Sequence, residues 1–148
     1  MMKFRVLSDL HLEFGSWGWI TESLEEDKDA ILLLCGDISN QKHPELCEQF
    51  LAMMWLMFDR VLFVPGNHEY YGRLFTVDET DRNLRKMCDE AGVYFLQRDA
   101  VHIDGIRFLG CTLWSNVSDQ TFKKLSNRTS ILNWSLEAEH ELHQRDVE

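Results

Sequence analysis

Three short runs of consecutive apolar residues constrain the fold of this chain more than any other feature. They cover residues 4–8, 30–35 and 61–64, and all three are rich in Val, Leu, Ile and Phe. None of them alternates apolar with polar residues, as a strand with one solvent-facing side would. Continuous apolar strands are typical of a sheet that is covered on both faces, so the runs predict a parallel sheet.

Two helices are predicted to connect these strands. Residues 44–60 open with a proline, which suits a first helical position, and continue with apolar residues at helical spacing. A capping box at 76–79 predicts the start of a second helix, and Gly92 is placed to end it. Strands that alternate with helices in this way indicate an α/β fold with right-handed crossovers.

The pattern changes after residue 93. Two β-prone runs, 101–103 and 106–111, flank Asp104-Gly105. Asp-Gly between such runs is a strong signal for a hairpin. We therefore expect an antiparallel hairpin after the parallel sheet, and a charged helix within 132–148.

Composition favours one soluble domain over residues 1–148. The chain has 25 acidic and 15 basic residues, and its net charge of −10 disfavours nucleic acid and anionic membranes as partners. No apolar run approaches the roughly 18 residues that span a bilayer, and the start lacks the apolar stretch of a secretion signal. The four cysteines form no C-x-x-C pair, which is typical of core thiols in a reducing compartment. We therefore expect a cytoplasmic protein.

Each predicted parallel strand ends at residues that can bind metal ions. The ends read Ser8-Asp9-Leu10-His11, Gly36-Asp37 and Gly66-Asn67-His68-Glu69. Each cluster alone is ordinary turn chemistry. The carboxyl ends of parallel strands share one edge of a sheet, however, and ligands bind there, so the three clusters are expected to converge. Mixed carboxylate, imidazole and amide ligands suit manganese, iron or zinc.

These three clusters resemble the opening motifs of the calcineurin-like metallophosphoesterases, Asp-x-His, Gly-Asp and Gly-Asn-His-Asp/Glu. The resemblance implies a four-layer α/β/β/α sandwich with a two-metal site that hydrolyses phosphoesters. By the same resemblance, Asp9 and His11 would bind the first ion and Asp37 would bridge both ions. Asn67 would bind the second ion, while His68 would lie over the scissile phosphate and protonate the leaving oxygen.

Two later motifs of that family, a lone metal-binding histidine and a closing Gly-His-x-His, are absent from this sequence. The second ion would then keep only Asp37 and Asn67, so the second site is expected to be incomplete. His140 and His143, three residues apart in the tail, are expected to face solvent. We interpret the chain as the amino-terminal part of such a domain, truncated at its carboxyl end. It is expected to form a dimer or to need a complementing carboxy-terminal piece.

Two functions of different classes stay open at this point. The first is metal-dependent hydrolysis of a phosphoester substrate by metal-activated hydroxide, with His68 as the leaving-group acid and the activity of this truncated form left open. The alternative is a non-catalytic remnant or interaction module that keeps a partial metal site. A nucleotide-binding α/β protein is disfavoured, because no glycine-rich phosphate motif follows any strand.

Overall fold

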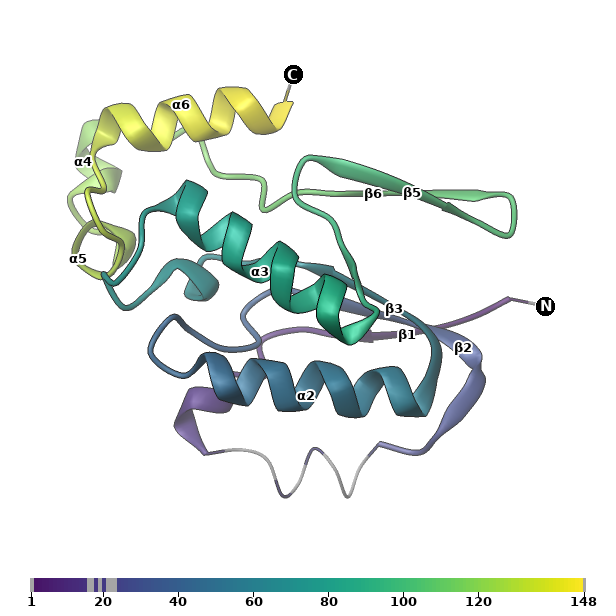
Figure 1. The fold of residues 1–148 in the computed structure, drawn as a ribbon. Coiled ribbons are helices and arrows are strands. Elements are labelled where there is room, and N and C mark those ends of the chain that lie inside the picture. The colour runs from purple at the N-terminus through teal and green to yellow at the C-terminus, as the bar shows by residue number, and fades with distance from the viewer. Residues whose placement is uncertain (1, 16–17, 19, 21–23, 148) are drawn as a thin grey trace.

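A parallel sheet forms the centre of the structure (Figure 1). The computed structural model describes residues 2–15, 18, 20 and 24–147. Four parallel strands lie side by side in the order β1 (Lys3–Leu7), β2 (Asp27–Cys35), β3 (Phe58–Val64) and β4 (Tyr94–Phe95). The three strands predicted from apolar runs are confirmed. β2 and β3 begin three residues earlier than their runs, and each extension contains charged, exposed residues that interrupt the apolar pattern, Lys28 and Asp29 in β2 and Asp59 and Arg60 in β3.

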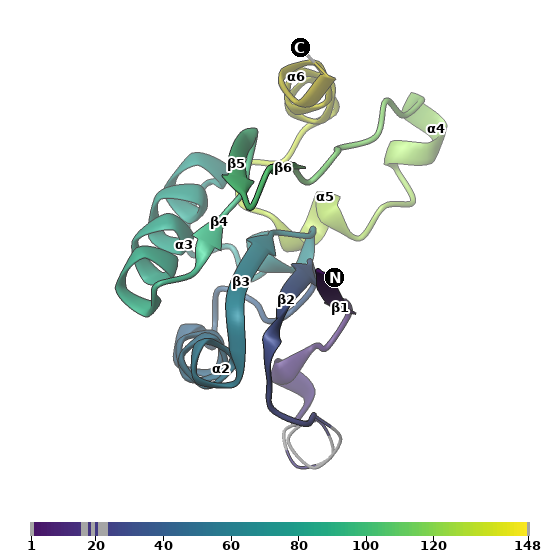
Figure 2. The same ribbon diagram turned by 90° about the vertical axis from the view of Figure 1, so that its right-hand side faces the viewer.

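Two helices, α2 (Pro44–Met57) and α3 (Val77–Ala91), cover one face of this sheet (Figure 2). Their apolar sides join the largest core cluster together with Leu32, Leu34 and Phe63 of the central strands. The expected alternation of strands and helices is therefore confirmed.

The ends of these helices follow local signals. α2 ends at Met57 rather than at residue 60, because Phe58 takes an extended conformation and begins β3. The predicted capping box is present: the side chain of Thr76 accepts a hydrogen bond from the backbone of Glu79, whose side chain accepts one from Thr76. Gly92 ends α3 in the left-handed conformation, with a φ of 75°.

An antiparallel hairpin of β5 (Asp99–Ile103) and β6 (Ile106–Gly110) packs against the other face of the sheet. Its turn has positive φ at both Asp104 (49°) and Gly105 (81°), as a two-residue hairpin turn requires. A second core cluster joins the sheet to the hairpin through Ile31, Leu62, Leu96 and Ile103. Adjacent residues of β2 thus point into two different cores, which explains why its apolar run is continuous.

The tail contains α4 (Asp119–Phe122), α5 (Asn127–Ser130) and α6 (Leu136–Val147). These helices pack around a third apolar cluster, which contains Tyr70, Trp114, Phe122, Ile131, Trp134 and Leu142. Among the described residues, none of the helices has both the length and the apolar character that crossing a bilayer needs.

The expectation that both tail histidines face solvent is wrong for His143. Its Nδ1 lies 2.7 Å from the carbonyl oxygen of Trp114, and the residue is half-buried. His140 is exposed, but its Nε2 lies 2.8 Å from the carbonyl oxygen of Val117. Both rings donate to backbone carbonyls because α6 docks on the segment that follows β6.

Candidate metal centre

Three loops at the carboxyl ends of β1, β2 and β3 carry the predicted ligands. We refer to residues 8–13, 36–40 and 66–69 as the first, second and third loops. The first loop continues alongside the second beyond the end of the sheet, where Asp9 N donates to Gly36 O and His11 N donates to Asp37 O, each at 3.0 Å. This pairing brings the side chains of both loops to the same edge.

Three of the predicted ligands have left-handed backbone conformations. The φ angles are 55° at Asp9, 46° at His11 and 55° at Asp37. A non-glycine residue in this region costs on the order of 1–3 kcal/mol and persists only where surrounding contacts enforce it. Such residues cluster at functional sites, and here they turn the chain at the positions predicted to bind metal.

The second and third loops approach so closely that two glycines are required. A Cβ on Gly36, which has a φ of 82°, would lie 2.7 Å from the backbone nitrogen of Gly66. A Cβ on Gly66 would overlap the carboxylate of Asp37. Larger residues would push these loops apart and separate the side chains they carry.

A buried carboxylate, Glu69, joins the second and third loops. One of its oxygens accepts hydrogen bonds from Asp37 N (2.9 Å) and Gly66 N (2.6 Å), and the other accepts from Ile38 N (2.6 Å) and Ser39 N (3.2 Å). Burial and the charge of Asp37 raise the pKa of Glu69 to about 7, although these backbone N–H groups oppose the shift. In the sequence Glu69 is only the last residue of the Gly66-Asn67-His68-Glu69 cluster, and its backbone partners cannot be identified from it.

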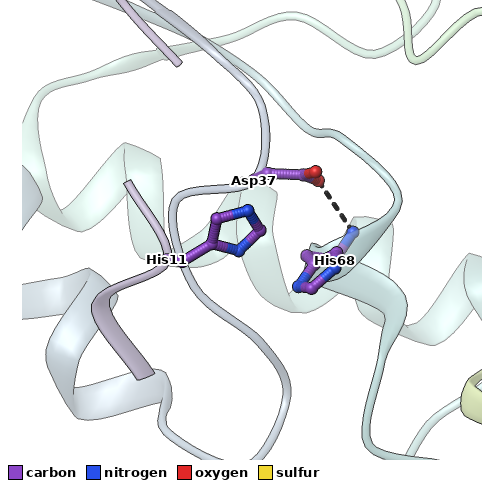
Figure 3. Close-up of side chains that lie close together, drawn as sticks. All are labelled: His11, Asp37 and His68. Carbon is purple, nitrogen blue, oxygen red and sulfur yellow. Dashed lines mark hydrogen bonds between the residues drawn. The ribbon is translucent and has the colours of Figure 1, made fainter. Parts of the chain in front are cut away.

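His11, Asp37 and His68 come together from the three loops (Figure 3). One ligand atom from each lies within 4.8 Å of the others, and all three residues are half-buried. The two imidazole rings are 4.3 Å apart between centroids and inclined at 71°. The dashed line in Figure 3 is the hydrogen bond that the backbone nitrogen of His68 donates to Asp37 Oδ1, at 2.9 Å.

This arrangement fits a divalent cation. The separations are close to those around a single ion, so small side-chain movements would let all three atoms contact one cation. Two polar atoms beside the cluster, His11 Nδ1 and Glu13 Oε2, are buried without a hydrogen-bond partner among the described residues. Burying polar atoms in this way is unfavourable unless something else compensates, which a cation near these groups would do.

The remaining predicted ligands lie beside the three-residue cluster. Asp9, Asp37 and Asn67 line one cavity of about 430 Å³. Asp9 is exposed, and its carboxylate contacts the hydroxyl of Ser8. The structure therefore brings His11, Asp37 and His68 into one cluster and places Asp9 and Asn67 on the adjoining cavity.

Asn67 is oriented by side chains that sequence reasoning missed. Its Nδ2 donates to the hydroxyl of Tyr71 (2.6 Å) and to Oδ1 of Asn127 (3.3 Å). The Tyr71 hydroxyl in turn donates to Asn127 Oδ1 at 2.7 Å. With Nδ2 engaged in this way, Oδ1 of Asn67 is the end of the amide left to bind an ion.

The far wall of the cavity comes from the tail. It contains residues 112–115, Val117, residues 125–127 and Glu139. Glu139 is 1% exposed and accepts a hydrogen bond from Trp134 Nε1 at 2.8 Å, while burial raises its pKa. Glu139 belongs to α6 and reaches the site because this helix docks on the segment that follows β6.

Comparison with known proteins agrees with this fold. The sequence profile described as calcineurin-like phosphoesterase matches residues 2–141. Uncharacterized protein L509 of Acanthamoeba polyphaga mimivirus is 30% identical over 138 residues, which are 85% of this chain and 49% of that protein. The chain therefore spans about half the length of this relative.

A solved structure is similar over nearly the whole chain. The crystal structure of phosphopantetheinyl hydrolase (PptH) from Mycobacterium tuberculosis has a TM-score of 0.70 at 22% identity, covering 97% of this chain and 60% of that one. At this identity the likeness supports the fold alone. It agrees with a parallel sheet followed by an antiparallel pair, as the sequence predicted.

Proposed function

Because this chain belongs to the calcineurin-like phosphoesterase family, we propose that it hydrolyses phosphoester bonds with the help of divalent metal ions. The observation that carries the proposal is the convergence of His11, Asp37 and His68, with ligand atoms within 4.8 Å of one another, at the carboxyl edge of the sheet. Ligands bind at this edge in open α/β sheets.

We assign the metal-binding roles as the motifs suggest. Asp9, His11 and Asp37 would hold the first ion, and Asp37 and Asn67, the latter through Oδ1, would hold the second. Carboxylate, imidazole and amide donors suit manganese, iron or zinc. When bound, such ions would hold the phosphoryl oxygens and supply hydroxide at neutral pH.

His68 is the proposed general acid. As the bond between phosphorus and the leaving oxygen breaks, the ring gives a proton to that oxygen, which departs as an alcohol. The alternative role for His68 is metal ligand, since its ring nitrogen is part of the three-residue cluster. The two roles differ in a measurable way, because loss of an acid lowers kcat while loss of a ligand also weakens metal binding.

The second ion is expected to bind more weakly than the first. Of its proposed ligands only Asp37 and Asn67 are available, and the nearby tail residues are already engaged: Glu139 with Trp134, and Asn127 with Tyr71. A non-catalytic module with one occupied metal site is therefore the alternative function.

A small phosphoester is the substrate class we propose. The cavity of about 430 Å³ suits a small molecule, and the net charge of −10 disfavours long nucleic acids. The cytoplasmic location stays a prediction, as does the dimer or complementing carboxy-terminal piece. A dimer or a complementing piece would cover exposed apolar side chains on β1 and β6. These are Phe4, Val6, Ile106 and Leu109.

Hydrolysis of p-nitrophenyl phosphate and of bis-p-nitrophenyl phosphate, with Mn²⁺ added, tests the proposal. We expect turnover that falls at least about 100-fold in Asp37→Asn and His68→Asn. The matched controls are Asp29→Asn, whose side chain is 86% exposed at the opposite end of β2, and His102→Asn in the exposed hairpin. Both controls should keep wild-type activity.

Calorimetric titration with Mn²⁺ completes the test. Asp37→Asn should weaken binding, whereas His68→Asn should leave the affinity unchanged if His68 is the acid. No turnover of either ester, together with at most one bound ion per chain, would refute hydrolysis and favour the non-catalytic module.

A further inference from the structure

We infer that Glu13 is a positioning residue, which holds the ring of His68 by its Nδ1 atom so that Nε2 of that ring points away from it. Its Oε1 lies 3.1 Å from Nδ1 of His68 and 3.5 Å from Nδ1 of His11. The Glu13 side chain is only 3% exposed. The catalytic consequence of this contact rests on the proposed function, whereas the orientation of the ring does not.

Because the Glu13 side chain is buried, its carboxylate must be stabilised by the groups that contact it. A carboxylate removed from water is unfavourable unless it is paired or hydrogen-bonded. Among the described residues, the ion pairs of Glu13 are to these two histidines, and its Oε2 has no hydrogen-bond partner. The Nδ1–H group of His68 is therefore the donor that compensates this carboxylate, and the ring of His11 lies near the same oxygen.

A short 3-10 turn brings the side chain of Glu13 close to the rings of His11 and His68. The left-handed φ of 46° at His11 starts a single 3-10 turn, η1 (Leu12–Phe14). Leu12 is fully buried, and its backbone nitrogen donates to Ile38 O at 2.9 Å, which fixes this turn against the second loop. Glu13 then reaches both His11, on its own loop, and His68, on the third loop.

The consequence concerns which nitrogen of the His68 ring carries hydrogen. A carboxylate only accepts hydrogen bonds, so Nδ1 of His68 must be the donor in this contact. In the neutral ring Nε2 then holds the free lone pair, which can take up a proton. To act as the acid, His68 must be the imidazolium, which keeps Nδ1–H on Glu13 and gives the Nε2 proton to the leaving oxygen.

Nitrogen-15 NMR of the imidazole rings tests the orientation without metal or substrate. In the neutral ring, observed at about pH 8.5, we expect His68 to carry hydrogen on Nδ1, whereas free histidine favours Nε2. Glu13→Ala should shift this ring toward the Nε2–H form. The matched control is Glu45→Ala, which removes an exposed carboxylate 3.3 Å from His43 Nδ1 and should leave His11 and His68 unchanged.

Steady-state kinetics then tests whether Glu13 positions His68 as the general acid. If Glu13 positions the acid, Glu13→Gln should lower kcat about 10- to 100-fold more for phenyl phosphate than for p-nitrophenyl phosphate, with KM little changed, because p-nitrophenolate leaves without a proton. Glu13→Gln keeps an amide oxygen of similar reach, so it should be less impaired than Glu13→Ala. A loss that is equal for both esters indicates a merely structural role and overturns the positioning.

The outcomes separate the two proposals. A wild-type His68 ring that carries hydrogen on Nε2 overturns the role of Glu13 even if the protein hydrolyses both esters, and this result needs no variant that folds. A His68 ring with Nδ1–H that Glu13→Ala shifts, in a protein without hydrolytic activity, supports the positioning and refutes the proposed function.

Discussion

Replacing Glu69 by glutamine tests how the second and third loops are held together. The two carboxylate oxygens of Glu69 each accept two backbone N–H groups, from Asp37 and Gly66 on one side and from Ile38 and Ser39 on the other. A glutamine amide has one oxygen and one NH₂ group, so one pair of backbone donors would face another donor. Glu69 is 3% exposed, which leaves little access for water to replace the lost acceptor.

The expected loss of unfolding free energy follows from two backbone N–H groups that would lack an acceptor. A buried donor without a partner costs about 1–3 kcal/mol, so Glu69→Gln should lose about 2–6 kcal/mol of unfolding free energy. Removing the repulsion between Glu69 and Asp37 offsets part of this, which favours the lower half of the range. The measurement belongs at about pH 8, above the pKa of about 7 to which burial and Asp37 raise Glu69, because the wild-type side chain is then ionised.

Equilibrium unfolding in urea, followed by tryptophan fluorescence in metal-free buffer, measures this cost. The matched control is Glu79→Gln, since glutamine can also serve at this position of a capping box, and it should leave the midpoint unchanged. A loss below about 1 kcal/mol in Glu69→Gln would refute the reasoning, because it would mean that the four N–H groups do not depend on the carboxylate.

Three further perturbations probe the packing around the site. Gly66→Ala should lose about 1–3 kcal/mol in the same urea assay, because its Cβ would overlap the carboxylate of Asp37; an unchanged midpoint contradicts the close approach. Burial raises the pKa of Tyr70 well above its usual value, so the folded form holds this proton longer than the unfolded form, and stability should fall as pH rises above about 10. Tyrosine ionisation can be followed by absorbance, and ionisation of all three tyrosines of the folded protein near that pH would contradict the raised pKa of Tyr70. A thiol reagent should label exposed Cys35 in the native protein, but Cys88, whose pKa burial raises to about 12, only after unfolding; mass spectrometry of the native protein would expose the error if Cys88 is labelled.

Much of the fold was predictable because its signals are local. The capping box at 76–79, the left-handed stop at Gly92 and the Asp104-Gly105 turn each depend on residues within a few positions of one another. The parallel sheet followed from continuous apolar runs, and the edge that gathers Asp9, Asp37 and Asn67 followed from the sheet. Periodicity was less reliable where an apolar stretch crosses from helix to strand, as at Phe58.

The supporting residues of the site could not be predicted in this way. The four backbone partners of Glu69 are visible only in the folded structure, so the sequence does not indicate its role. Glu13 lies 55 residues from His68 in sequence. Asn127 is 60 residues from Asn67. The tail looked like a solvated charged helix because its apolar face is narrow, and the burial of Glu139 and Leu142 depends on docking against distant residues.

The charges of the site also set the order in which ligands can bind. Among the ion pairs of the described residues, none joins a lysine or arginine to Asp9, Asp37 or Glu69, whereas Arg98 is paired with Asp81 and Asp146. A phosphate group entering this site without a cation would meet the carboxylates of Asp9 and Asp37 with no lysine or arginine paired to them, and like charges at close range oppose binding. A bound divalent ion inverts that local field. Inorganic phosphate should therefore bind measurably only after Mn²⁺ is added, and calorimetric binding of phosphate with equal affinity in the presence of a chelator would contradict this order.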